Sequence, residues 1–261
     1  GDIKMKLKKL LLTLIVLILL LPYQQINAES ESPDITAGAA LLMDSKTSKI
    51  LYSKNENEKM YPASTTKIMT AILTIENCNL DDIVTVPYDA IATIPSGYSI
   101  AALQTGEQLT VNQLLQLMMV HSANDAANVL AFHVAGSLES FATMMNTKVA
   151  ELGLEHTHFL NPSGMHNEDH YTTAYDLAKL MQYCMKNSTF RTIAGLKFCT
   201  VPATNKYGER IFTSTNELLT LVDNRNVASN YYYKYAIAGK TGYTTEAKNC
   251  LVSVSNKDGF D

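Results

Sequence analysis

Residues 61–76 read YPASTTKIMTAILTIE, and this stretch decides how the rest of the chain is interpreted. Four of its apolar residues recur at helical spacing: Ile68, Met69, Ile72 and Leu73. This spacing predicts a helix that buries one face. Pro62 lies two residues before Ser64, as expected where a helix begins near that serine. The pattern therefore places Ser64 in the first turn of a helix and Lys67 on the same face.

Working outward, strand-like runs stand towards both ends of the chain and helical runs lie between them. The strand-like runs predict two hairpins, 38–43 with 50–52 and 235–240 with 250–255, the second closed by residues 241–249. The helical runs are 110–153, with a polar break at 121–125, and 174–185, where Thr173 and Asp176 resemble a capping box. Without a β-α-β rhythm, this order predicts an α/β (α+β) fold. In it, one antiparallel sheet built from both hairpins is flanked by helices and a helical subdomain.

The first 28 residues have the features of a secretory signal peptide. Four lysines accompany the apolar run 10–21, which is 12 residues long, whereas a membrane-spanning helix needs about 20. Ala28 offers a cleavage point, but Ile26 departs from the usual cleavage pattern, so an uncleaved anchor is the alternative. In both cases the body lies outside the cytoplasm, secreted or membrane-associated at the cell envelope. The predicted divisions are upstream residues and signal (1–28), linker (29–36) and one domain (37–261).

Composition excludes several classes of protein. The 261 residues are 46% hydrophobic, which is typical of a globular chain, and 18% charged, which is below the usual figure of about 25%; neither value suits a disordered or coiled-coil chain. The net charge of −4 includes the basic leader, so the body is more acidic, and we expect neither nucleic acid nor an anionic membrane face as its main partner.

We expect no cofactor and no metal. His156 and His158 lack further ligands at zinc spacing. The four cysteines permit two disulfides, but in a chain with its own core free thiols are favoured; they are Cys78, Cys184, Cys199 and Cys250.

Ser64 and Lys67 form the first of three short motifs that carry chemistry. A serine at a helix start lies near unsatisfied N–H groups that favour negative charge developing in acyl transfer. A neutral Lys67 amine can accept the serine proton if burial and a neighbouring cation, for which Lys240 is a candidate, lower its pKa. The alternative is an ordinary helix cap with a solvated lysine beyond it.

The other two motifs are Ser122-Ala123-Asn124 and Lys240-Thr241-Gly242. At a break between helices, Ser122 can relay a proton and the Asn124 amide can hold a substrate carbonyl, although the same residues also suit a helix start. Gly242 lets an extended substrate lie against a strand edge, with a free carboxylate near Lys240 and Thr241. The alternative is a strand-to-turn exit with Lys240 in solvent.

These ordered motifs resemble those of penicillin-binding proteins and class A β-lactamases. More narrowly, the chain resembles the low-molecular-mass D-alanyl-D-alanine carboxypeptidases over nearly its whole length after the signal. The flanking segments that carry this resemblance are 39–76, 161–165, 172–178, 235–244 and 247–254. The resemblance implies a DD-peptidase/β-lactamase-like fold and a peptidoglycan stem peptide as substrate. It also implies covalent inhibition by β-lactam antibiotics.

The resemblance also implies residue roles. Ser64 would attack the carbonyl of the penultimate D-alanine, Lys67 would act as general base, and Ser122 with Lys240 would complete the proton path. The oxyanion would lie between the N–H groups of Ser64 and Tyr243. The residues expected to bind substrate are Asn124, Lys240, Thr241, Gly242 and Tyr243.

Three alternatives stay open at this point. A class A β-lactamase needs a glutamate four residues before the loop asparagine, but Thr157 lies there before Asn161 and Glu155 is out of register. A transpeptidase would resolve the acyl-enzyme with an amine, and a non-catalytic penicillin sensor would stay acylated. The strand and helix that follow 251–254 in the family are not recognised before residue 261, so we expect a catalytic domain truncated at its C-terminus.

Overall fold

The structure is a computed structural model that describes residues 2–8, 33–222 and 228–259. The chain divides into two compact units, 1–36 and 37–261. Most of the predicted signal peptide, and residues 29–32 of the predicted linker, lie outside the described residues. Within the described ranges, no helix combines the length and the apolar character needed to cross a bilayer.

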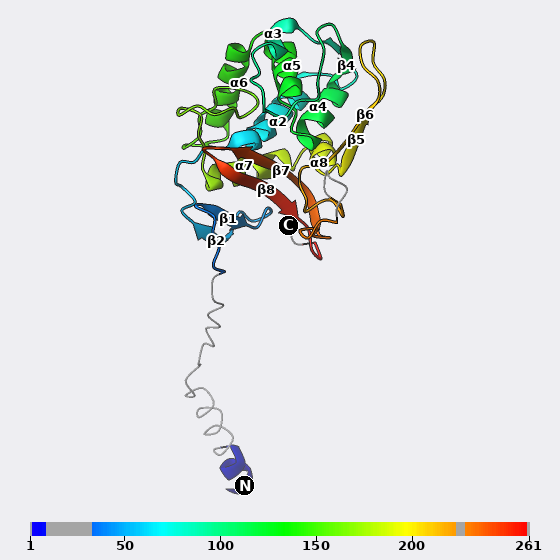
Figure 1. Ribbon diagram of the computed structural model, residues 1–261. Helices are drawn as coiled ribbons and strands as arrows, with labels where there is room; N and C mark the ends of the chain where they lie inside the picture. The colour runs from blue at the N-terminus through cyan, green and yellow to red at the C-terminus, as the bar shows by residue number, and fades with distance from the viewer. Residues whose placement is uncertain (1, 9–32, 223–227, 260–261) are drawn as a thin grey trace. The chain divides into compact units, whose positions relative to one another are not determined.

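The second unit contains all three motifs, and its elements can be followed in Figure 1. The strands are β1 (Ala40–Met43), β2 (Ile50–Lys54), β3 (Ile83–Thr85), β4 (Gln108–Thr110), β5 (Phe198–Val201), β6 (Arg210–Thr213), β7 (Ala236–Thr244) and β8 (Lys248–Ser255). The helices are the 3-10 turn η1 (Ala63–Thr66), α2 (Lys67–Asn77), α3 (Tyr88–Ile91), α4 (Val111–Val120), α5 (Asn124–Ala135), α6 (Leu138–Glu151), α7 (Ala174–Cys184) and α8 (Ser188–Ala194).

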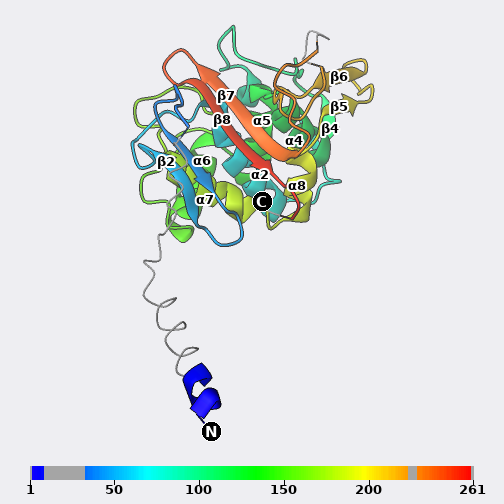
Figure 2. The same ribbon diagram turned by 90° about the horizontal axis from the view of Figure 1, so that it is seen from below.

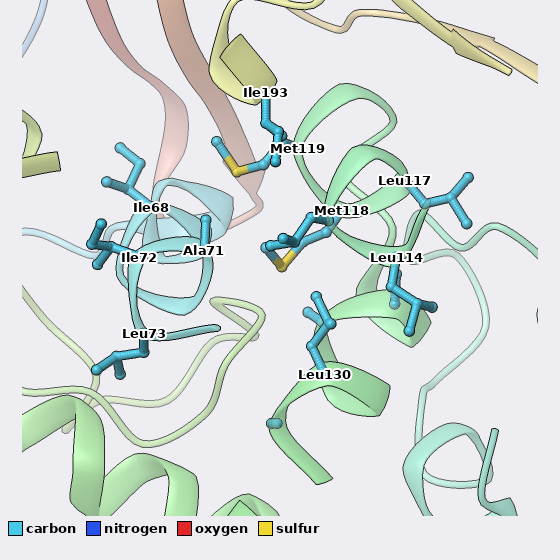
Figure 3. Packing of buried hydrophobic residues seen from close by; sticks show 14 of the residues in the cluster. Ile68, Ala71, Ile72, Leu73, Leu114, Leu117, Met118, Met119, Leu130 and Ile193 are labelled. Atoms are coloured by element: carbon cyan, nitrogen blue, oxygen red, sulfur yellow. The ribbon is translucent and has the colours of Figure 1, made fainter. Parts of the chain in front are cut away.

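Helix α2 is the centre of the core. It contacts α4, α5, α6, α7 and α8, and in Figure 3 Ala71 lies on the side of α2 that faces Met118 and Met119 of α4, whereas Ile72 points to the opposite side. The sequence predicted one buried face, but every residue from Lys67 to Thr74 is buried. The prediction was too narrow because helices surround α2, and a helix covered all round has no solvent face. A lysine at its first position is therefore inside the protein.

The helical predictions are otherwise confirmed. The run 110–153 forms α4, α5 and α6, and its predicted break lies between α4 and α5 at residues 121–123. Helix α7 begins as predicted, because Thr173 Oγ1 accepts the backbone N–H of Asp176 at 3.0 Å. The reciprocal half of the predicted capping box is not formed. The Asp176 carboxylate accepts the His156 N–H instead.

Both predicted hairpins form, but the second is longer than expected. The β7–β8 ladder continues through Tyr243↔Asn249 and Thr244↔Lys248. The turn is therefore confined to residues 245–247, closed by the Ala247 N–H donating to Thr244 Oγ1 at 3.0 Å. As a result the motif 240–242 lies within the strand rather than at its end.

The prediction of one sheet built from both hairpins is wrong for the described residues, whose strands form four separate two-stranded antiparallel ladders. The β1–β2 and β7–β8 ladders both contact α7, and Figure 2 shows them on the same side of the helices. The two ladders remain separate sheets, since no described strand forms hydrogen bonds with strands of both ladders. One edge of β7 accordingly has no strand partner within the described chain.

Candidate active site

Ser64 lies on the 3-10 turn η1, directly before α2, where the sequence predicted a helix start. Ala63 holds a left-handed backbone conformation with φ of 46°, which is costly for a residue with a side chain. The turn is held by Pro62, whose carbonyl accepts the Thr65 hydroxyl at 2.7 Å. Gly164 packs against it so closely that a Cβ there would lie 1.8 Å from the Ala63 carbonyl oxygen. The neighbouring loop therefore holds a strained nucleophile turn in place.

Lys67 brings the first motif together with two other segments. Its Nζ lies 2.8 Å from Ser64 Oγ. It also lies 2.6 Å from Asn124 Oδ1 and 2.7 Å from the carbonyl oxygen of Ser163. A neutral amine can donate to the last two oxygens and keep its lone pair for the serine hydroxyl.

The environment of Lys67 favours that neutral form. Burial lowers the pKa of Lys67 well below its ordinary value, and the positive charge of Lys240 lowers it further. The Asp125 carboxylate acts in the opposite direction. Both causes named from the sequence, burial and a neighbouring cation, are present, and a solvated lysine is excluded.

The second motif occupies the break between α4 and α5. Ser122 is buried and has φ of 64°, and the chain is anchored there by the Asn124 N–H, which donates to the Ser99 carbonyl at 2.8 Å. Asn124 Oδ1 accepts from Lys67, whereas its Nδ2 makes no hydrogen bond to another described residue. That amide group is the one available to a substrate carbonyl.

The third motif places a second lysine in the interior. Lys240 is 1% exposed, and its Nζ donates to Ser122 Oγ at 3.0 Å and to the Thr241 carbonyl at 2.8 Å. Burial lowers the pKa of Lys240 to about 7. Near neutral pH this lysine therefore exists in both charge states, and the alternative of a solvated Lys240 is also excluded.

Gly242 brings β7 against the nucleophile. A Cβ at Gly242 would lie 2.9 Å from the backbone nitrogen of Ser64, so a larger residue would push the strand away from the serine. Tyr243 follows it in β7 with its side chain largely in solvent. The predicted residues thus form two contact groups, Ser64–Lys67–Asn124 and Ser122–Lys240–Thr241, joined through residues 122–124 and the approach of Gly242.

The structure adds a third segment, the loop 161–165, whose role the sequence did not predict. Asn161 Oδ1 accepts the N–H groups of Gly164 at 2.8 Å and Met165 at 3.0 Å. This tight turn presents the Ser163 carbonyl to Lys67. The Asn-Pro-Ser-Gly sequence signalled a loop, but not that its carbonyl would contact the lysine.

His170 ties that region to the nucleophile turn. Its Nδ1 accepts the Leu160 N–H at 3.0 Å, so its Nε2 carries the proton and donates to Thr66 Oγ1 at 2.8 Å. Burial, with smaller contributions from His158 and His166, lowers the pKa of His170 to about 3. His170 is therefore a neutral positioning residue.

Two further positioning residues were also missed. Asp125 is buried, and its carboxylate accepts the N–H groups of Ala101 at 2.9 Å and Leu103 at 3.0 Å, which fixes the loop beside the α4–α5 break. Thr215 Oγ1 lies 2.6 Å from Thr241 Oγ1, the hydroxyl expected to meet a substrate carboxylate. Within the described ranges, no group of three or more His, Cys, Asp or Glu side chains is placed to hold a metal ion.

A partly exposed serine bonded to a buried lysine, a second lysine–serine pair and a glycine-bearing strand beside the first serine are the features of a serine acyl-transfer site of the penicillin-binding class. The family model for D-alanyl-D-alanine carboxypeptidases matches residues 26–261. The chain therefore belongs to the D-alanyl-D-alanine carboxypeptidase family, and the family and fold class predicted from the sequence are confirmed.

Individual relatives agree with this assignment. The chain is 33% identical to D-alanyl-D-alanine carboxypeptidase DacF of Bacillus subtilis, over 96% of this chain and 63% of that protein. It is 37% identical to a D-alanyl-D-alanine carboxypeptidase of a Streptomyces species, over 87% of this chain and 79% of that protein. A solved Streptomyces DD-transpeptidase matches with a TM-score of 0.78 at 35% identity, covering 88% of each chain.

Proposed function

We propose that this chain is a serine-type D-alanyl-D-alanine carboxypeptidase that removes the terminal D-alanine from peptidoglycan stem peptides. The observation that carries the proposal is the 2.8 Å contact between Lys67 Nζ and Ser64 Oγ inside the protein. Burial favours the neutral form of the lysine, and a neutral amine at this distance can accept the serine proton. The chain spans 63% of the length of the Bacillus relative.

In the acylation step, Ser64 Oγ attacks the carbonyl carbon of the penultimate D-alanine while Lys67 takes its proton. The developing oxyanion is stabilised by the N–H groups of Ser64 and Tyr243, which the close approach at Gly242 supports. The peptide bond then breaks as Ser122 passes a proton to the leaving amine, and Ser122 is reprotonated at the expense of the Lys67 ammonium, which leaves Lys67 neutral for the next step. Terminal D-alanine departs and an ester to Ser64 remains.

Deacylation completes the cycle with water. A water molecule attacks the ester carbonyl, Lys67 accepts its proton, and Ser64 regains its hydroxyl hydrogen. Asn124 is placed to hold the acyl chain by an amide hydrogen bond, because its Oδ1 is already occupied by Lys67. The products are the shortened peptide and free D-alanine.

The substrate carboxylate binds next to the second lysine. Lys240 supplies a positive charge, and the Thr241 hydroxyl supplies a donor that Thr215 orients at 2.6 Å. A dipeptide end carrying a free carboxylate therefore fits better than an internal peptide bond. Penicillins present a similar carboxylate beside a reactive amide, and they acylate Ser64 in the same way.

The location of the protein and the alternative enzyme classes are considered on the same proposal.

The protein is exported by its N-terminal signal and acts on the outer side of the cytoplasmic membrane. A class A β-lactamase is disfavoured because the residue four positions before Asn161 is a threonine, Thr157, whose hydroxyl is bonded to Thr172 and Asp176. Transfer to an amine is kept as the second function, since the matches from Streptomyces K15 carry both names, D-alanyl-D-alanine carboxypeptidase for the curated sequence and DD-transpeptidase for the solved structure.

The test is D-alanine release from diacetyl-L-lysyl-D-alanyl-D-alanine, with covalent labelling by a fluorescent penicillin in parallel. We expect release and labelling by the unsubstituted protein and neither in Ser64→Ala. Labelling without release would support the sensor alternative, and release only when an amine is supplied would support the transpeptidase. Release that persists in Ser64→Ala would refute the proposed nucleophile.

A further inference from the structure

A hollow of about 430 Å³ is lined by residues that adjoin the Ser64 turn and the end of β7 in the chain, and it has no role in the steps above. Three segments line it: residues 59–61, Glu168 with Tyr171, and Glu246 with Ala247 of the β7–β8 turn. Its walls combine apolar surface from Met60, the tyrosines and Ala247 with charged groups. Sites that bind a ligand side chain have this mixed character.

Each of the three segments is also connected along the chain to a residue that lies against Ser64 or Lys67. Residues 59–61 lead directly into the turn that carries Ser64. The loop that contains Glu168 begins with Ser163, whose carbonyl contacts Lys67 at 2.7 Å. The turn that contains Glu246 continues β7 beyond Gly242, whose Cβ position lies 2.9 Å from the Ser64 nitrogen. The segments that line the hollow are therefore the same ones that hold Ser64, Lys67 and Gly242 in position.

The direction of β7 indicates which part of a bound substrate would lie at the hollow. In the proposed mode, the substrate carboxylate lies at Lys240 and Thr241 and the scissile carbonyl at Ser64. The remainder of the peptide then runs along the unpaired edge of β7 towards Thr244 and the turn. Extended chains advance about 3.3 Å per residue, so the residue before the two D-alanines lies about 7 to 10 Å from the carboxylate. That distance corresponds to Thr244, next to Glu246.

The charges at the hollow select the kind of side chain. Glu168 and Glu246 are both exposed, and neither forms an ion pair with another described residue. Lys59 is turned onto the ring of Tyr171, 4.1 Å from its centroid. Two carboxylates against one ammonium leave a net negative rim above apolar walls. A side chain with methylene groups and a terminal ammonium matches both parts.

On the basis of the proposed function, we propose that this hollow binds the side chain of the residue that precedes D-alanyl-D-alanine and selects one whose terminal amine is free. Acylation of that amine removes the charge that Glu168 and Glu246 attract. In a peptidoglycan stem, a free amine means that the stem has not been cross-linked through that residue. The site thereby prefers uncross-linked stems.

The experiment compares two peptides that differ only at this amine: Nα-acetyl-L-lysyl-D-alanyl-D-alanine and its Nα,Nε-diacetyl form. We expect kcat/KM to be about threefold to tenfold higher for the free-amine peptide, as solvent-exposed charge pairs allow. The preference should shrink when salt is raised from low to about 1 M, because exposed charges are screened.

Variants separate the hollow from the general charge of the protein. In the double variant Glu168→Gln/Glu246→Gln, the ratio of kcat/KM for the two peptides should fall towards one. Glu209→Gln removes the same charge from an exposed position outside the hollow, and should keep the ratio of the unsubstituted protein.

Two results would overturn the inference while leaving the proposed function standing. One is equal kcat/KM for both peptides in the unsubstituted protein. The other is a preference that survives in the double variant or disappears equally in Glu209→Gln. If the protein hydrolyses neither peptide, the proposed function fails and the inference fails with it.

Discussion

Lys240 Nζ donates to Ser122 Oγ at 3.0 Å, which links the third motif to the second across 118 residues of sequence. The lysine is buried, and burial lowers its pKa to about 7. Its charge in turn lowers the pKa of Lys67. In the proposed mechanism the two lysines therefore have opposite tasks: the protonated form of Lys240 acts as a cation, and Lys67 acts as a neutral base.

The pH dependence of the reaction should follow Lys240. Above pH of about 7 the free protein loses the Lys240 proton, and a neutral amine no longer attracts the substrate carboxylate. We expect kcat/KM for diacetyl-L-lysyl-D-alanyl-D-alanine to fall above that pH. A peptide ending in D-alaninamide lacks the carboxylate and should show no such fall. A profile that is flat from pH 6 to pH 9 for the carboxylate substrate would contradict this role.

Lys67 should be needed for acylation but not for folding. Lys67→Ala removes the group 2.8 Å from Ser64 Oγ, and loss of a general base costs about 10²- to 10⁴-fold in rate. The measurement is the second-order rate of labelling by a fluorescent penicillin, with circular dichroism to check the fold. Lys186→Ala, at an exposed position, is the matched control. Normal labelling of folded Lys67→Ala would remove this lysine as the base.

Much of the fold could be predicted from the sequence because its local signals are strong. The apolar period of 68–73 and the polar break at 121–125 are local patterns, and the structure has a helix and a helix break at these places. The missed elements are short: β3, β4, β5, β6 and α3 have three or four residues each, and α8 has seven. Their few residues carry too little periodicity to stand out from a loop.

The candidate site shows the same division between local and non-local information. Seven of the eight predicted residues came from motifs with fixed spacing and Tyr243 came from the family resemblance; the structure brings six of the eight into two hydrogen-bonded contact groups. Thr215 and His170 were missed because their roles depend on partners 26 and 104 residues away. A single threonine or histidine carries no spacing signal, so only the fold reveals it.

Acid should destabilise the protein through His170. The pKa of His170 is lowered from 6.5 to about 3 in the folded chain, so between these values the unfolded chain binds a proton that the folded chain does not. Stability is therefore lost as pH falls below about 6.5, by up to a few kcal/mol near pH 3. His170→Gln keeps a donor for Thr66 and should make thermal unfolding less sensitive over this range. His133→Gln, at an exposed histidine, should leave the pH dependence unchanged.

Thr215 should affect substrate binding more than chemistry. Thr215→Val removes the hydroxyl that lies 2.6 Å from Thr241 Oγ1, and a lost hydrogen bond of about 1 kcal/mol corresponds to several-fold in affinity. We expect KM to rise about threefold to tenfold with a smaller change in kcat. Thr192→Val, which loses an exposed hydroxyl on α8, is the control. An equal loss in kcat for the Thr215 variant would instead assign it a part in the chemical step.

Gly164 provides the sharpest test of how the nucleophile turn is held. Gly164 and Gly97 both have positive φ, 83° and 91°, so alanine at either position costs about 1 kcal/mol or more in backbone strain. A Cβ at Gly164 would also lie 1.8 Å from the Ala63 carbonyl oxygen, whereas a Cβ at Gly97 meets nothing within 4 Å.

Gly164→Ala should therefore lose about 3 kcal/mol or more of unfolding free energy, since a clash with backbone adds to the strain. Because the displaced atom belongs to the residue before Ser64, penicillin labelling should also slow in whatever fraction remains folded. Gly97→Ala should lose only the strain and keep its labelling rate. Chemical denaturation of both variants, with labelling measured in parallel, separates these outcomes. Equal stability losses in the two variants would mean that the loop does not press on the nucleophile turn.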